Sequence, residues 1–190
     1  MRFTKAHNIK SALAEELGIN NYPGVDISHC PDSTLEEEVI FYNLELLHLN
    51  CVGPILDAFE GNIGIKSAYR CEELNKAMGG SPNSQHIRGY AIDLVSPTFP
   101  TATLFDWVIL NLPEWNQVIW EYPERGQFSS NNQNSSWLSI SYIKDNNPKT
   151  KSVSSKIENL HKAYENDKTS RIGDYTHNIT SATEFINIIE

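Results

Sequence analysis

The chain has 190 residues and a formal net charge of −9, which suits one acidic domain with a short appendage. Negative charge repels duplex phosphates, so the composition argues against sequence-independent nucleic-acid binding. Apolar runs fall short of the roughly 18–20 residues that a membrane span needs. The first residues also lack the apolar stretch of a secretory signal, so we expect synthesis in the cytoplasm without a signal peptide.

The N-terminal part predicts two helices separated by a turn cluster. Ser11–Leu17 is typical of a short helix, and Gly18 is the expected end of it. Residues 20–24 contain the Asn, Pro and Gly of a turn. A longer helix is expected after residues 32–34, which offer an N-cap. Glu36–Glu38 would then lie in its first turn, where the helix dipole favours anions.

Apolar residues recur at helical spacing along this longer helix and indicate its continuation. They are Val39, Tyr42, Leu46 and Leu49, and later Ile55 and Phe59. Gly53-Pro54 interrupts the pattern, because proline lacks the N–H that a helix needs. We therefore expect a kink there, or two helices in series.

The rest of the chain alternates short strands with helices and loops. Strands are expected at residues 65–69, 90–95, 118–122 and 137–143, and helices at residues 72–78 and 101–110. Residues 144–156 are polar and rich in breakers, which indicates a linker, and residues 157–166 and 181–189 are short helical candidates. Since βαβ units are not visible, the sequence predicts an α+β domain over residues 1–143 and a linker with a helical tail over residues 144–190.

The three cysteines are far apart and odd in number, at Cys30, Cys51 and Cys71. This spacing argues against a disulfide framework and against a CxxC metal site. We expect free thiols, buried or half-buried, in a reducing compartment.

A series of short elements occurs in fixed order between Ser67 and Asp93. They are Ser67-Ala68-Tyr69-Arg70, Leu74-Asn75, Gly79-Gly80-Ser81, Ser84-Gln85-His86, Gly89 and Ala91-Ile92-Asp93. With residues 18–21 and 118–121, they make residues 3–143 resemble the zinc D-alanyl-D-alanine carboxypeptidase family, in the branch common among phage lysins and tail-associated peptidases. The resemblance implies an α+β fold with N-terminal helices on a small antiparallel sheet, plus a C-terminal tail.

His86 and Asp93 are the candidate metal ligands. A tight return between them would bring an imidazole and a carboxylate together, and both suit zinc. Gly89 permits the close turn. The resemblance implies a third ligand, a histidine in a Trp-x-His element, but Ser139 stands at that position here. Residues 134–136 offer no carboxylate as a general base, so the sequence predicts that hydrolytic zinc chemistry is lost.

Other residues keep two interpretations each. The resemblance implies that Arg70 holds a substrate carbonyl or oxyanion, but it could equally pair with Asp93 or Glu121 as a structural residue. Glu121 matches a family carboxylate, and could also be a strand-end acid bonded to Arg70 or to a loop. His177, in an Asp-x-x-His element of the tail, is a remote candidate for a third ligand. The four tryptophans could form a sugar-stacking surface or belong to the core: Trp107, Trp115, Trp120 and Trp137.

Two functions follow from the resemblance. The favoured hypothesis is a catalytically degenerate homologue of phage-type peptidoglycan peptidases, made in a host cytoplasm and serving as a virion structural or cell-wall-associated protein. The alternative is an active zinc D-Ala-D-Ala carboxypeptidase or endopeptidase, an endolysin that cleaves peptidoglycan stem peptides. The expected partners are peptidoglycan or virion proteins, and we expect the protein to assemble with other chains. Zinc is the implied cofactor, and the loss of a ligand puts it in doubt.

Overall fold

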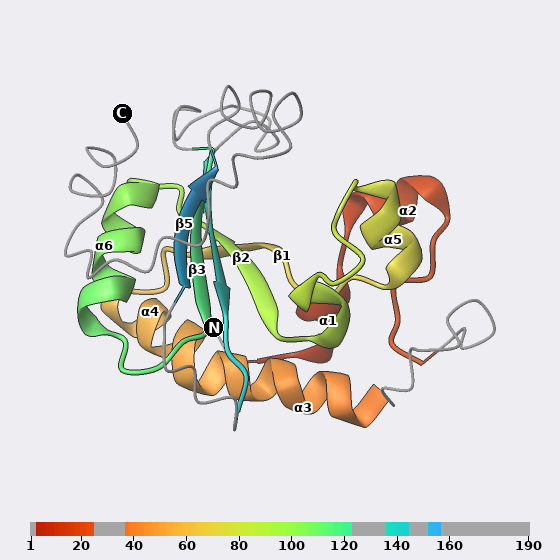
Figure 1. Cartoon of the computed structure of the whole chain (residues 1–190), viewed down its shortest axis with the longest axis horizontal. Coiled ribbons are helices and arrows are strands. Elements are labelled where there is room, and N and C mark those ends of the chain that lie inside the picture. Colours follow the sequence, from red (N-terminus) through yellow and green to blue (C-terminus); the bar gives the residue numbers. More distant parts are fainter. Residues whose placement is uncertain (1–2, 25–36, 123–135, 145–151, 157–190) are drawn as a thin grey trace, which may run out of the picture.

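The computed structural model describes residues 3–24, 37–122, 136–144 and 152–156, the last of these by its backbone alone. The helices and strands in chain order are α1 (Lys5–Ile9), α2 (Ala12–Leu17), α3 (Glu37–Leu47), a π-helix (His48–Val52), α4 (Gly53–Ala58), β1 (Gly64–Ser67), α5 (Glu72–Ala77), a 3-10 helix (Gln85–Arg88), β2 (Ala91–Val95), α6 (Thr101–Asn111), β3 (Gln117–Glu121), β4 (Trp137–Ser141) and β5 (Ser152–Lys156). In Figure 1, α6 lies on one side of the sheet, while α2 and α5 form a smaller lobe on the other.

The sheet has the strand order β1-β2-β4-β3-β5. The pairs among its first four strands are antiparallel, which confirms the predicted α+β class. These four strands form the small antiparallel sheet that the resemblance implies, and β5 extends it at one edge by pairing with β3 in parallel. This edge strand also comes from the segment predicted as a linker. Most of the predicted tail lies outside the described residues, and the division at residue 143 stays a prediction.

Local capping explains the predicted helix of the N-terminal lobe. The Ser11 hydroxyl accepts a hydrogen bond from the Ala14 N–H and caps α2 at its start. Gly18, with a φ of 68°, adopts the left-handed conformation that ends the helix. Both predicted boundaries are confirmed to within one residue.

The helical run Glu37–Ala58 is interrupted where Gly53-Pro54 predicts it. The Gly53 N–H bonds to the His48 carbonyl five residues earlier, so the turn before Pro54 widens into a π-helix. By length and apolar composition this run of 22 residues could cross a membrane, but 56% of its apolar window is buried inside the protein. It therefore supplies core contacts, as a central helix does.

The apolar spacing correctly predicts α3, but most of the residues that carry it lie on the exposed side of the helix. Val39, Tyr42 and Leu49 are 38%, 49% and 71% exposed. The buried positions are Ile40, Phe41, Leu44, Leu47 and Cys51. The helix therefore carries apolar residues on two sides, and only one of them belongs to the buried core.

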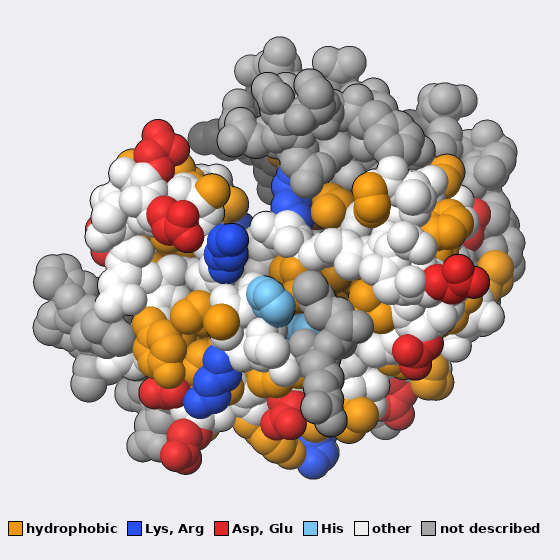
Figure 2. Space-filling model, turned by 180° about the vertical axis from the view of Figure 1, so that it is seen from behind, with side chains coloured by type: hydrophobic (Ala, Val, Ile, Leu, Met, Phe, Trp, Pro, Cys, Tyr) orange, Lys and Arg blue, Asp and Glu red, His pale blue; other side chains and the backbone are white. Residues whose placement is uncertain are grey.

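The two faces of the sheet differ in chemistry because successive side chains along a strand point to opposite sides. One face is apolar and joins the buried core through Ile92, Leu94, Val118, Trp120, Leu138 and Ile140. The other face carries Asp93, Ser139, Ser141 and Glu121, all buried. On the side of the molecule seen in Figure 2, several basic side chains lie toward the middle, while acidic ones lie mostly nearer the rim.

The tryptophans do not form one sugar-stacking surface. Trp115 and Trp120 are buried at 4% and 7% exposure and belong to the core. Trp107 packs edge-on against Phe59, with ring centroids 5.8 Å apart. Trp137 is half-buried, and the Lys66 ammonium lies 4.3 Å from its ring centroid. The core interpretation therefore holds for most of the set.

Candidate metal and substrate site

The strand register brings the predicted site residues together. Asp93 on β2 lies directly opposite Ser139 on β4 and also pairs with Ser67 on β1. His86 comes from the 3-10 helix just before β2, and Gly89 ends that helix with a φ of 70°. A Cβ at Gly89 would lie 2.6 Å from the Ile40 carbonyl oxygen, so both its conformation and its packing require glycine.

His86 and Asp93 meet as their spacing predicts. The His86 Nε2 atom lies 3.3 Å from Asp93 Oδ1, and both side chains are buried. The other ring nitrogen, Nδ1, donates to the Ala68 carbonyl at 2.6 Å. A backbone carbonyl behind an imidazole fixes the ring orientation and directs the second nitrogen toward Asp93.

Asp93 is ionised in spite of its burial. Burial is the largest influence on its pKa and acts to raise it, but the charge and hydrogen bond of His86 oppose it, followed by the charge of Arg70 and a hydrogen bond from Ser139. Together they hold the pKa of Asp93 below its ordinary value. The pocket therefore contains a fixed negative charge.

Arg70 is held close to this charge. Burial lowers the pKa of its guanidinium, while the charges of Asp93 and Glu121 act in the opposite direction. Its backbone N–H donates to the His86 carbonyl at 3.3 Å. Within the described part of the chain, its buried Nε has no hydrogen-bond partner. Arg70 thus balances two acids and keeps one N–H available inside the pocket.

Glu121 ends β3 and is 7% exposed. It lies opposite Trp137 in the β3–β4 register, two residues from Ile119, which faces Ser139. Residues two apart share a sheet face, so Glu121 lies on the face that carries Asp93. The charge of Glu121 acts to raise the pKa of Arg70, which supports the prediction that the two side chains interact.

The residues present fit only part of a zinc site. Two donors bound at about 2.0–2.1 Å to a tetrahedral zinc lie about 3.3–3.4 Å apart, which matches the 3.3 Å between His86 and Asp93. The third side offers the neutral hydroxyl of Ser139. Among the described residues, no group of three or more His, Cys, Asp and Glu side chains could hold a metal ion. His177 lies outside the described residues, so its proposed role stays a prediction.

The other expected absence concerns the general base. Residues 134 and 135 lie outside the described residues. The Ser136 hydroxyl accepts a hydrogen bond from the Trp120 Nε1–H at 2.8 Å, and the Ser136 carbonyl accepts one from Thr101. Ser136 therefore links the core to β4. Cys51 and Cys71 are free thiols, as expected, and Cys30 lies outside the described residues.

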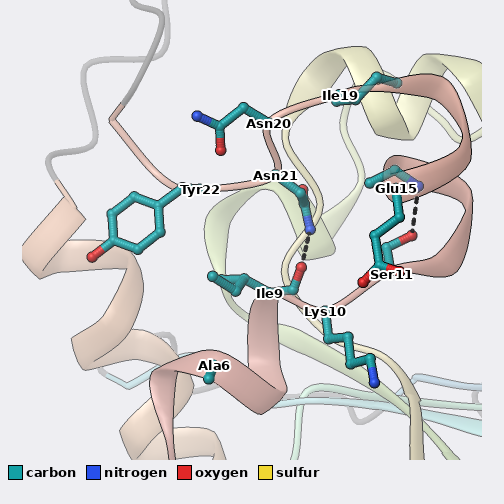
Figure 3. A pocket seen from close by; sticks show the side chains of 10 residues that line it. Ala6, Ile9, Lys10, Ser11, Glu15, Ile19, Asn20, Asn21 and Tyr22 are labelled. Atoms are coloured by element: carbon teal, nitrogen blue, oxygen red, sulfur yellow. Dashed lines mark hydrogen bonds between the residues drawn. The ribbon is translucent and has the colours of Figure 1, made fainter.

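A separate pocket of about 310 Å³ lies in the N-terminal lobe, between α1, α2 and the loop at residues 19–22. Figure 3 shows Asn21 at its edge with an amide that points to the Ile9 carbonyl. The same amide donates to the Tyr69 carbonyl, and its oxygen accepts from the Cys71 N–H. Asn21 is thus hydrogen-bonded to the residues on both sides of Arg70, a role that the sequence did not predict.

Comparison with known proteins agrees with this geometry. Residues 25–108 match the family model described as Peptidase M15, while no curated protein matches the chain significantly. The matched stretch contains Arg70, His86 and Asp93, and it ends before β3 and β4, which carry Glu121 and Ser139. Residues 25–108 therefore match the peptidase M15 family, and this match confirms the resemblance read from the motifs between Ser67 and Asp93.

Proposed function

We propose that the chain is a catalytically degenerate homologue of peptidoglycan peptidases and serves as a virion structural or cell-wall-associated protein. The observation that carries this proposal is the position of Ser139. It lies directly opposite Asp93 in the β2–β4 register, beside His86, where the resemblance implies the third zinc ligand. Membership of a peptidase family supports the link to peptidoglycan.

The donor set explains the expected loss of hydrolysis. A catalytic zinc needs three protein ligands and an open position for water, which it converts into a nucleophile. Ser139 supplies a neutral hydroxyl, and that hydroxyl already donates to the Asp93 carboxylate. An imidazole and one carboxylate then remain as strong donors, too few to hold the ion for catalysis.

Ser139 does not offer a substitute nucleophile. A serine needs a base that removes its proton, usually a histidine. Both ring nitrogens of His86 already have partners, the Ala68 carbonyl and Asp93. The lowered pKa of Asp93 makes that carboxylate a weak base. Metal-free acyl transfer through Ser139 is therefore unsupported.

Arg70 supports a role in binding without cleavage. Its buried Nε–H has no partner in the described part of the chain, and it lies among Asp93 and Glu121. Such a group can donate to a carbonyl or carboxylate of a bound peptide. A stem peptide held there without an activated water would remain intact, as a cell-wall-associated protein requires.

Metal content and hydrolysis test the proposal together. After dialysis, the purified full chain should retain far less than one zinc ion per molecule by atomic emission. It should also leave a D-Ala-D-Ala peptide uncleaved when zinc is added. One tightly held zinc with turnover of the peptide would establish an active carboxypeptidase or endopeptidase in place of the scaffold.

The alternative of an active endolysin has one observation in its favour. The 3.3 Å separation of His86 and Asp93 suits two donors of one zinc ion. It requires a further donor, and the sequence offers His177 as a remote candidate. If stoichiometric zinc is found, His177→Ala should abolish it under this alternative, whereas His161→Ala should leave it unchanged.

A further inference from the structure

An exposed apolar stripe runs along α3 and into the π-helix. It consists of Val39, Tyr42, Leu46 and Leu49, which we call the α3 stripe. Leu49 is 71% exposed, Tyr42 49% and Val39 38%, and Leu46 is half-buried. Figure 1 shows α3 along one edge of the molecule, where one side faces away from the sheet. The stripe is therefore available to another molecule.

The spacing of the α3 stripe suits another helix. Its members follow one another by three, four and three residues, which is the spacing of the seam between two packed helices. The core does not need them, because the opposite side of the same run supplies Leu44, Leu47 and Cys51, all fully buried. Contiguous exposed apolar side chains with a polar border are typical of interaction sites.

The border of the stripe is acidic. Glu38 and Glu45 immediately precede Val39 and Leu46, occupy equivalent positions seven residues apart, and are exposed. Lys144 contributes one positive charge, through a hydrogen bond from its ammonium to the Tyr42 hydroxyl at 3.2 Å. On the other side of the stripe, the uncharged Asn50 follows Leu49 and is half-buried, while Asn43, which follows Tyr42, is buried and donates to the Arg88 carbonyl.

This charge pattern argues against a second copy as the occupant. Two antiparallel copies of α3 would place the glutamate borders of the two chains against each other, and each chain carries a net charge of −9. A partner helix with lysine or arginine along its flank would instead meet Glu38 and Glu45 with opposite charge. Charge complementarity therefore selects a basic partner.

We propose that the α3 stripe docks an amphipathic helix of another protein that has an apolar seam and basic flanks. Apolar contact with Leu49 and Tyr42 supplies most of the affinity, and the acidic border selects the partner. The site is separate from the pocket of His86 and Asp93, and the proposal does not depend on whether that pocket is catalytic.

Two synthetic helical peptides test this directly with the full chain. Both have leucine at the seam positions; one has lysine along its flanks and the other has glutamate. Fluorescence anisotropy should show binding of the lysine peptide and about tenfold weaker binding of the glutamate peptide at low salt. Raising the salt to about 0.5 M should reduce this preference, since exposed charges are screened.

Point variants assign the binding to the stripe. Leu49→Ser should weaken the lysine peptide about tenfold, and Glu45→Gln should weaken it about two- to fivefold. Leu110→Ser is the matched control, because Leu110 is 63% exposed on α6. It should leave binding unchanged, and circular dichroism melts should show all three variants folded.

Four outcomes would overturn the proposal. Equal binding of both peptides would show that the surface binds apolar helices non-specifically. An equal loss of peptide affinity in Leu49→Ser and Leu110→Ser would show the same. Failure of the lysine peptide to bind would mean that no basic helix docks there. Concentration-dependent dimers in sedimentation that Leu49→Ser abolishes would identify a second copy as the occupant.

Discussion

Two buried histidines of this protein have opposite surroundings. His86 and His48 are 6% and 7% exposed. The ring of His86 lies between a backbone carbonyl and the Asp93 carboxylate, with Arg70 close by. The ring of His48 contacts the neutral side chain of Asn8 at 2.9 Å and the edge of Phe3. Burial alone therefore does not mark a functional histidine; charged neighbours do.

The difference has an energetic meaning. Burial lowers the pKa of His48 to about 4, so its imidazole is neutral at pH 7 and donates from Nε2 to Asn8 Oδ1. Around His86, charges of both signs are buried together, and each depends on the others. One histidine is packed against a neutral side chain, while the other lies beside a buried carboxylate with a guanidinium close by.

The largest effect on stability is expected from removing the Asp93 carboxylate. Asp93→Ala should leave the buried guanidinium of Arg70 with one fewer counter-charge, and should lower the free energy of unfolding by about 3–5 kcal/mol. Urea unfolding at pH 7 measures this. Ser141→Ala, at a buried position on the same sheet face, should cost less than about 1 kcal/mol; equal losses would contradict the contrast.

The buried, neutral imidazole of His48 predicts that the stability of the protein depends on pH. Because the folded pKa of His48 is about 4 and its ordinary value is 6.5, the folded state disfavours the protonated ring. Its contribution to stability is complete above pH 6.5 and is lost as the pH falls toward 4. About 2–3 kcal/mol should disappear across this window.

Urea unfolding at several pH values from 7 to 4 checks this, with His48→Gln as the comparison. The glutamine cannot be protonated, so the difference between the two proteins isolates His48 from other titrating groups. His7→Gln, at an exposed position, is the control and should follow the unmodified protein. A parallel pH course for His48→Gln would show that His48 does not cause the loss.

A third prediction concerns a variant that adds a third metal ligand beside His86 and Asp93. Ser139→His should create a third ligand opposite Asp93, and zinc at a hundred times its dissociation constant should then stabilise the fold by about 2.7 kcal/mol. Ser141→His, two residues along β4, is the matched control and should gain nothing. Turnover of a D-Ala-D-Ala peptide should stay low, since residues 134–136 offer no carboxylate as a general base, and full activity would show that a base exists elsewhere.

The smallest predicted effect concerns the turn that places His86. Gly89→Ala adds a Cβ at a φ of 70° and within 2.6 Å of the Ile40 carbonyl oxygen, so stability should fall by about 2 kcal/mol. Thermal unfolding measures it. Gly79→Ala has a similar φ of 71° but open space around the Cβ, and should cost clearly less; equal costs would remove the packing argument.

Local features of this fold could be predicted from the sequence, and long-range ones could not. Ser11 and Gly18 mark the ends of α2 by their own chemistry, and the spacing from His86 to Asp93 is short enough to fix their meeting. The apolar spacing predicted α3 as a helix, but it could not say which side is buried, because periodicity identifies an apolar face without saying what covers it.

Strand pairing gave the other misses. The five residues of β5 are polar apart from Val153 and carry no strand pattern, yet they pair in parallel with β3. The position of Ser139 opposite Asp93 agrees with the resemblance, whereas its hydrogen bond to Asp93 became visible only in the structure. Register depends on the whole sheet, so single motifs carry little information about it.

The bridge made by Asn21 has a consequence for dissecting this protein. One amide from the N-terminal lobe fastens both neighbours of Arg70. A fragment cut at the borders of the family match, residues 25–108, would lose that fastening along with β3 and β4. The residues that match the family model therefore do not form a complete folding unit, and a fragment of residues 25–108 should be unstable when it is expressed alone.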